Sequence, residues 1–199
     1  MKKEDDREQV NITERGFLNK LGLFFLELIK VTLLAGVTIV LIRYFLFKPF
    51  YVKGQSMEPT FYERDYLIID EISYRFRAPE RGEIIVFRAP VASDNYLKRI
   101  IGLPGERIKV EGNKVVVYNN EYPQGVIIQE SYLEEQTPGS VSITLGPDQY
   151  FVLGDNRDAS YDSRRFGPIS VNDIVGRVVF RGWPFSRLTS FGNLPEYNL

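Results

Sequence analysis

The chain has 199 residues, of which 44% are hydrophobic and 26% are charged, and its formal net charge is -1. This length suits one domain, or one domain with a small elaboration, and the charge gives no reason to expect a nucleic-acid partner. Because cysteine and histidine are both absent, composition excludes cysteine nucleophiles, thiolate zinc sites, disulfides and histidine bases.

A long apolar segment follows a polar N-terminus. Residues 1–20 are balanced in charge and lack an apolar period, which is typical of a flexible tail. Residues 21–42 are long enough, at about 1.5 Å per residue, to cross a hydrocarbon core of about 30 Å. Glu27 and Lys30 interrupt the run, but on a helix they lie three residues apart and can pair. An amphipathic helix packed on a soluble domain is less favoured, because residues 31–42 have no polar face beyond two threonines.

A cleavable signal peptide is the other alternative for this segment, since a charged start and an apolar run fit it. Residues 43–51, however, lack the small-x-small spacing of a cleavage site, and their aromatic and basic side chains are typical of a membrane interface. Charge does not decide the orientation, because five Lys or Arg residues lie in 1–20 and four in 43–64.

From residue 66 onward, short β-rich runs replace the helical period. Gly112 and Asn113 separate two runs and predict a two-residue hairpin loop. Residues 119–148, rich in Gly, Pro, Glu and Gln, are predicted to form a small inserted β cap. The fold prediction is therefore mostly β: one N-terminal transmembrane helix, then an antiparallel β domain over residues 43–199. The expected strands cover residues 66–72, 83–87, 97–103, 107–110, 114–118, 126–131, 141–145, 149–153 and 174–181.

Ser56 stands in a predicted turn, between the permissive Gly54 and the rigid Pro59. On this stretch alone, an ordinary turn serine is the simpler interpretation. A nucleophilic serine needs a base, and without histidine a lysine can serve only if desolvation lowers its pKa from about 10.4 by about two units or more.

Lys98 is the lysine that fits this requirement. On a strand it shares a face with Tyr96 and Ile100, whereas Arg99 points the other way. A surface lysine on an edge strand is the alternative, because basic pairs are common there.

Residues 154–167 form a third informative stretch, in which Asp, Asn, Arg and Ser alternate between two glycines. This composition suits a loop braced by its own hydrogen bonds and Asp/Arg pairs. A solvated loop is the simpler alternative. A calcium loop is disfavoured, because no Glu stands where an EF-hand requires one.

Four motifs occur in order after the apolar segment: GQSMEPT at 54–60, RGEIIVFR at 81–88, YLKRIIGLPGE at 96–106 and GDNRDASYDSR at 154–164. Together they closely resemble type I bacterial signal peptidases, and the resemblance extends to about residue 185. It implies a serine endopeptidase that cleaves signal peptides from exported precursors after small-x-small sites, through an acyl-enzyme and without a cofactor or metal.

By the family pattern, Ser56 is the nucleophile and Lys98 is the general base. Gly54 stands where some members carry a hydroxyl that helps to hold the oxyanion, so the Ser56 backbone N–H is expected to act without a side chain. The resemblance also implies supporting residues: a hydroxyl that orients the lysine amine, an ion pair that stiffens the site, and two further loop positions. They are Ser160, then Asp162 with Arg164, then Asp155 and Asn156.

The resemblance implies a single-pass protein of the cell membrane, with residues 1–20 cytosolic and the catalytic domain outside; a thylakoid membrane stays open. Its partners would be signal-peptide-bearing precursors and membrane lipid, with no nucleic acid. The substrate is expected to bind as an extended strand, with apolar residues near Ser56 and in 84–87 as candidates for its pockets. The surface around Phe61 and residues 183–185 either meets lipid or packs in the core.

Two rival functions share parts of this pattern. A self-cleaving, repressor-like serine/lysine protein would need its own scissile segment and a DNA-binding domain, and the apolar anchor argues against both. A membrane-tethered binding module would explain the anchor and the strands, but not the serine, the lysine and the braced loop together.

Overall fold

The computed structural model describes residues 20–40, 47–90, 94–133 and 135–199. The chain forms two compact units, Met1–Phe45 and Leu46–Leu199. The first contains the helix Lys20–Val40, which is the one helix within the described residues that is long and apolar enough to cross a membrane. Its apolar side chains are exposed around its whole circumference. Helices that are apolar on all sides are found in membranes or in the core of large proteins. Residues 1–19 of the predicted tail, and residues 41–46, lie outside the described part.

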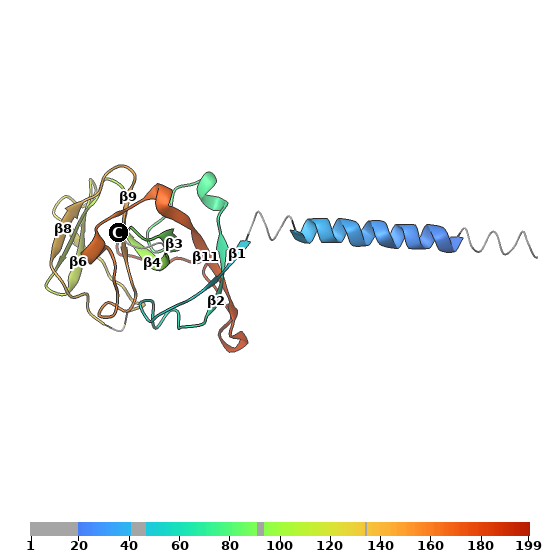
Figure 1. The fold of residues 1–199 in the computed structure, drawn as a ribbon. Coiled ribbons are helices and arrows are strands. Elements are labelled where there is room, and N and C mark those ends of the chain that lie inside the picture. The colour runs from blue at the N-terminus through green and yellow to red at the C-terminus, as the bar shows by residue number, and fades with distance from the viewer. Residues whose placement is uncertain (1–19, 41–46, 91–93, 134) are drawn as a thin grey trace, which may run out of the picture. The chain divides into compact units, whose positions relative to one another are not determined.

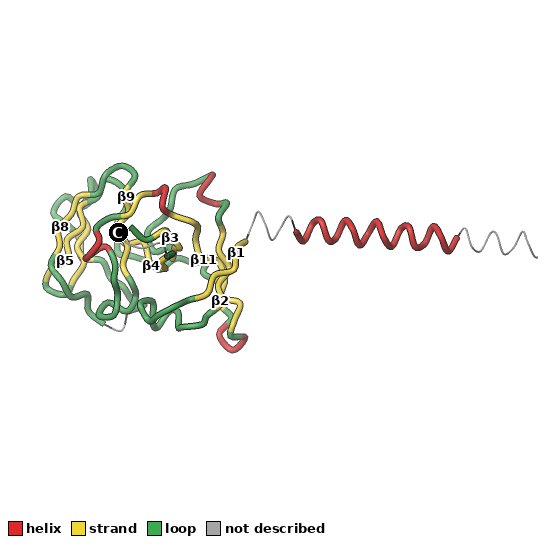
Figure 2. Tube along the Cα trace, in the orientation of Figure 1, coloured by secondary structure: helices red, strands yellow, loops and turns green. Residues whose placement is uncertain are grey.

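The second unit contains two antiparallel sheets, and Figure 2 shows that strands and loops dominate it. The larger sheet has the order β1-β2-β11-β3-β4-β9-β10, with β12 paired to β11, and the smaller has the order β7-β6-β5-β8. The larger sheet consists of β1 (Phe47–Tyr51), β2 (Tyr66–Asp70), β3 (Ile84–Arg88), β4 (Asn95–Gly102), β9 (Gln149–Leu153), β10 (Ile169–Ser170), β11 (Ile174–Trp183) and β12 (Thr189–Ser190). The smaller consists of β5 (Arg107–Glu111), β6 (Lys114–Tyr118), β7 (Val126–Ile127) and β8 (Val141–Thr144).

The predicted fold class, an apolar N-terminal helix followed by antiparallel β structure, is confirmed. The hairpin prediction is also confirmed: Glu111 pairs with Lys114, and Gly112 and Asn113 both have positive φ angles, as a tight two-residue loop requires. The run predicted over 126–131 is too long, because β7 ends at Ile127. Short helices complete the unit, at α2 (Ser163–Phe166), η1 (Ser73–Arg75), η2 (Val171–Asp173) and η3 (Phe185–Arg187).

The cap prediction covers only part of the smaller sheet. Residues 119–148 supply β7 and β8, but β5 and β6 precede them, so the sheet begins at Arg107. Figure 1 shows this sheet beside the larger one, with β4 and β9 between it and β11. A buried cluster joins the two sheets, because Ile108 and Val117 pack with Ile101 and Leu153.

Strand β4 lies inside the larger sheet, between β3 and β9. One face of β4 contributes Ile100 and Tyr96 to a cluster with β3 and β9, and the other contributes Leu97 and Ile101 to the two remaining clusters. The surface-lysine alternative for Lys98 is wrong, because both cations of β4 are only 4% exposed.

Candidate active site

Ser56 lies in a turn that two buried side chains hold in place. Met57 and Phe61 are 1% and 0% exposed and belong to one core cluster, and the Phe61 N–H donates to the Met57 carbonyl at 2.8 Å. Gly54 has a φ of 80°, which an L side chain rarely adopts, and the space beside it is open. The turn therefore anchors its apolar residues and leaves the half-buried Ser56 at the surface of the domain.

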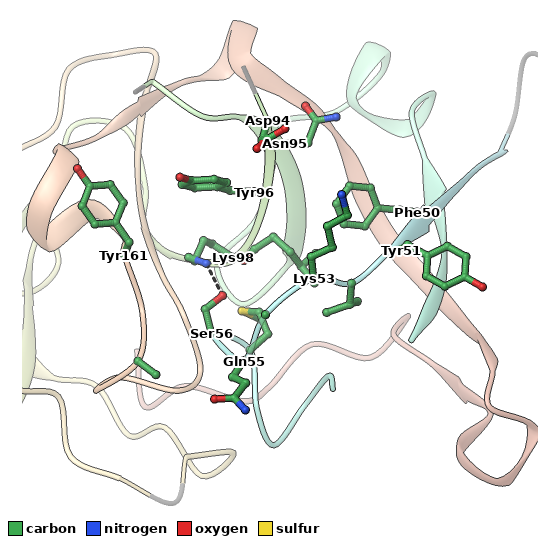
Figure 3. A pocket seen from close by; sticks show the side chains of 15 residues that line it. Phe50, Tyr51, Lys53, Gln55, Ser56, Asp94, Asn95, Tyr96, Lys98 and Tyr161 are labelled. Carbon is green, nitrogen blue, oxygen red and sulfur yellow. Dashed lines mark hydrogen bonds between the residues drawn. The ribbon is translucent and has the colours of Figure 1, made fainter. Parts of the chain in front are cut away.

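Lys98 reaches Ser56 from strand β4. Its Nζ lies 2.6 Å from Ser56 Oγ and donates a second hydrogen bond to the Leu97 carbonyl at 3.0 Å. The Tyr96 ring lies on the same face, with its centroid 5.6 Å from Nζ. Figure 3 shows the amine and the hydroxyl pointing toward each other across the end of a cavity.

Burial lowers the pKa of Lys98 from 10.5 to about 8, although the charges of Asp162 and Asp155 act in the opposite direction. The side chain is 4% exposed, and no carboxylate among the described residues contacts its amine. A substantial fraction of Lys98 is therefore neutral, and able to accept a proton, at mildly alkaline pH.

Asp162 and Arg164 form the ion pair that the loop composition predicts. Arg164 Nε and NH2 each lie 2.8 Å from an Asp162 oxygen, and Asp162 also accepts the Gly154 N–H and caps the start of α2. Burial alone would raise the pKa of Asp162, but the hydrogen bonds and charge of Arg164 hold it below its ordinary value. Asp162 is therefore a fixed negative charge.

Asp155 is paired with Arg99, a residue that the sequence interpretation left without a role. Arg99 NH2 and Nε lie 2.7 and 2.9 Å from the two Asp155 oxygens, and Thr60 donates to the same carboxylate at 2.6 Å. The available signal was that Leu97 and Ile101, two residues to either side, place Arg99 on an apolar face. Asp155 and Asp162 are each paired with an arginine, so their carboxylates are not free to bind calcium. This disfavours the calcium-loop alternative.

Asn156 contacts the turn of Ser56 through its backbone. Its N–H donates to the Ser56 carbonyl at 3.1 Å, while its side chain accepts the Ala159 N–H within the loop. A Cβ added at Gly154 would overlap both Ser56 O and Ser160 Oγ, so the loop can approach the turn this closely only because this residue is glycine.

Ser160 is 4% exposed and lies beside Gly154. Its Oγ makes no hydrogen bond of ordinary geometry among the described residues, but it contributes to the lowered pKa of the Asp162 carboxyl. Its role in orienting the lysine amine therefore stays a prediction.

Arg157 is a second residue that the sequence interpretation missed. It is 1% exposed, donates from Nε to the Gly154 carbonyl at 2.8 Å and pairs with Glu130 at 2.5 Å. It thus links the loop of residues 154–167 to the segment between β7 and β8. Its partner lies 27 residues away in an irregular segment, so sequence periodicity could not have indicated the pairing.

A cavity of about 410 Å³ opens beside Ser56 and Lys98. Two backbone segments line it, residues 50–57 and 94–98, together with Ala159 and Tyr161 (Figure 3). The candidates in 84–87 are not among the residues that line this cavity, and all four are buried in the core clusters.

Comparison with known proteins gives the family. A family model described as signal peptidase, peptidase S26, matches residues 25–183. The chain belongs to the signal peptidase I family.

Curated relatives agree with this assignment. A signal peptidase I from Leptolyngbya laminosa is 37% identical over 81% of this chain and 83% of its own length. A probable signal peptidase I-2 from Synechocystis sp. is 39% identical over 82% of this chain and 76% of its own length. A signal peptidase IB from Staphylococcus aureus is 34% identical over 81% of this chain and 91% of its own length. A crystal structure of a signal peptidase I from Enterococcus faecalis V583 is 30% identical, with a TM-score of 0.44, over 51% of this chain and 97% of that chain.

As a member of the signal peptidase I family, the chain is a serine peptidase that cleaves signal peptides from secreted precursors. This assignment decides against both rival functions, the self-cleaving repressor-like protein and the tethered binding module.

Proposed function

We propose that Ser56 is the nucleophile and Lys98 the general base of signal peptide cleavage. The observation that carries this proposal is the 2.6 Å distance between Lys98 Nζ and Ser56 Oγ, together with the burial of the lysine. The neutral amine takes the hydroxyl proton while Oγ attacks the scissile carbonyl carbon. The ammonium then protonates the leaving amine, and the acyl group stays on Ser56. Lys98, neutral again, activates the water that hydrolyses this ester.

The oxyanion is assigned to the Ser56 backbone N–H, which makes no hydrogen bond within the described residues. Gly54 offers no side chain to help, and its positive φ disfavours one. A single backbone donor, fixed by the buried Met57 next to it, then supplies the electrostatic stabilisation.

The substrate is proposed to bind as an extended strand along the cavity. Residues 95–98 of β4 pair with β3 on one side, and β9 pairs with β4 only from Arg99 onward. No strand of the described residues pairs with the other edge of 95–98, which borders the cavity, so an incoming strand can bind there. The small residues before the cut would fit against the shallow lining beside Ser56.

The protein is proposed to be anchored by the helix Lys20–Val40, with its N-terminus cytosolic and its catalytic domain extracytoplasmic. Trp183 and Phe185 are 51% and 71% exposed and stack edge to face at 4.9 Å, which suits contact with the membrane interface. Phe61 takes no part in this contact, because it is fully buried.

The proposal is tested with full-length protein in detergent and a precursor that carries a small-x-small site. The parent is expected to cut once, after that site. Ser56→Ala is expected to lose at least about 10³-fold in kcat/KM while keeping its fold, because no second nucleophile replaces the hydroxyl. Lys114→Ala, which removes an exposed lysine of β6, serves as the control and should retain full activity. Cleavage by Ser56→Ala at the parent rate would refute the assignment.

A further inference from the structure

The C-terminal residues 193–199 cross from one sheet to the other. A Cβ added at Gly82, just before β3, would overlap the side chains of Pro195 and Tyr197, so the backbone there lies against this segment. Farther along, the Asn198 side chain accepts the Gln129 N–H at 2.8 Å and donates to the Ile127 carbonyl at 2.9 Å. Figure 1 places the C-terminus between the two sheets, in agreement with these contacts.

Tyr197 begins a chain of hydrogen bonds that leads toward Ser56. Its hydroxyl lies 3.2 Å from that of Tyr132, and Tyr132 donates to Glu130 at 2.6 Å. Because the Tyr132 proton is used on Glu130, Tyr197 is the donor in the first bond. Glu130 pairs with Arg157, which in turn donates to the Gly154 carbonyl.

A second branch also starts at Tyr132. Its ring lies under the Arg99 guanidinium, with Cζ 4.0 Å from the ring centroid, and Arg99 holds Asp155 at 2.7 Å. The two branches therefore end on adjacent residues, Gly154 and Asp155. The next residue, Asn156, donates its N–H to the Ser56 carbonyl.

We propose that residues 193–199 form a strap that positions the nucleophile, and that Tyr197 is its positioning residue, acting through Tyr132 on the loop segment 154–156. Tyr197 does not touch the reacting atoms. It holds Tyr132 against Arg99 and against Glu130, the partner of Arg157, and the two arginines fix the loop that contacts Ser56. The inference rests on the proposed role of Ser56.

A strap of this kind affects turnover, whereas a merely structural tail affects only the fraction of molecules that are folded. We therefore compare kcat and KM for the full-length protein in detergent, well below its unfolding temperature, with folding checked by circular dichroism. Tyr197→Ala is expected to lower kcat about tenfold, and Tyr197→Phe about threefold, with KM changed by less than about twofold, because small displacements of a nucleophile reduce the rate strongly.

Two controls separate positioning from stability. Glu196→Ala changes an exposed neighbour in the same segment and should leave kcat unchanged. Ile169→Ala removes buried atoms from β10, in a core cluster that contains neither Tyr197 nor a residue of either branch, and should lower the unfolding temperature without lowering the kcat of the folded enzyme. If Tyr197→Ala retains the parent kcat, or if Ile169→Ala lowers kcat as much as Tyr197→Ala does, the strap proposal is wrong.

A double-mutant cycle tests the route. Tyr132→Phe combined with Tyr197→Phe should lower kcat no more than Tyr132→Phe alone, since both changes break the same chain. If the two effects multiply, Tyr197 does not act through Tyr132. Ser56→Ala, measured in parallel, keeps the two proposals apart: an active Ser56→Ala overturns the nucleophile assignment, whereas an inactive Ser56→Ala with fully active Tyr197 variants overturns only the strap.

Discussion

Lys98 and Arg99 are neighbours in β4, and each is 4% exposed, yet their surroundings are opposite. On one face, Lys98 contacts a hydroxyl and a carbonyl and borders an open cavity. On the other face, Arg99 forms a two-point ion pair with Asp155. Burial lowers the pKa of Lys98 to about 8, whereas for Arg99 the charge and hydrogen bonds of Asp155 outweigh burial and raise the pKa further.

The presence or absence of a contacting carboxylate, rather than the depth of burial, separates the two cations. A paired buried cation stays charged and braces the structure. An unpaired one can lose its proton and so becomes a base. Asp162 lies close enough to influence Lys98, but its oxygens are occupied by Arg164 and the Gly154 N–H, so it stays a fixed charge that does not contact the amine.

The contrast between Lys98 and Arg99 requires that activity depend on Lys98, the cation that no carboxylate contacts. Lys98→Met keeps the volume of the side chain and removes the amine, so we expect kcat/KM for a precursor to fall at least about 10³-fold. Lys98→Arg should be as inactive, because a guanidinium stays protonated. Either variant cleaving within about tenfold of the parent rate would show that another group is the base.

The same two positions should respond oppositely in stability. Arg99→Met leaves the buried Asp155 without its charge partner and is expected to lower the free energy of unfolding by about 3–5 kcal/mol. Lys98→Met removes an amine that folding holds below its ordinary pKa, and is expected to raise the free energy of unfolding by up to about 3 kcal/mol at neutral pH.

The sign follows from proton counts. Between pH about 8 and 10.5, the folded protein binds fewer protons at Lys98 than the unfolded chain, so the parent gains stability as the pH rises through this window. The advantage of Lys98→Met should therefore be largest below pH 8 and shrink toward 10.5. Denaturant unfolding at three pH values measures the difference in free energy of unfolding between Lys98→Met and the parent. A difference that grows with pH would contradict the assigned pKa shift.

Much of this arrangement could be predicted from local patterns. Strand alternation placed Lys98 and Arg99 on opposite faces, and the composition of the loop indicated the pair of Asp162 and Arg164. The partners of Arg99 and Arg157 could not be predicted in this way, because they lie 56 and 27 residues away and meet only when the strands are paired. The Tyr197 contact with Tyr132 is of the same kind, since a short tail without periodicity carries no signal of where it packs.

A pH profile sharpens the comparison by measuring Lys98 directly. In the proposed mechanism only the neutral amine accepts the Ser56 proton, so kcat/KM should rise about tenfold per pH unit below pH 8 and level off above it. Arg99 does not titrate in this range and adds no second step. Steady-state rates from pH 6 to 10 with a peptide that carries no titrating group would show the rise. A flat profile across that range would argue against a lysine base.

Ser160 gives the smallest expected effect, and it tests how the unpaired amine is held. Its buried Oγ makes no hydrogen bond of ordinary geometry among the described residues and only helps to lower the pKa of Asp162, so removing the hydroxyl should change the free energy of unfolding by less than about 1 kcal/mol. If this hydroxyl orients Lys98 once substrate is bound, Ser160→Ala lowers kcat by up to about tenfold, while the unfolding temperature stays close to that of the parent. Ser163→Ala is the matched control, because Ser163 Oγ accepts the Val152 N–H at 3.0 Å and its loss should reduce stability before activity. Full activity in Ser160→Ala would show that the Ser160 hydroxyl does not orient Lys98, and that Ser56 and the Leu97 carbonyl suffice to hold the amine.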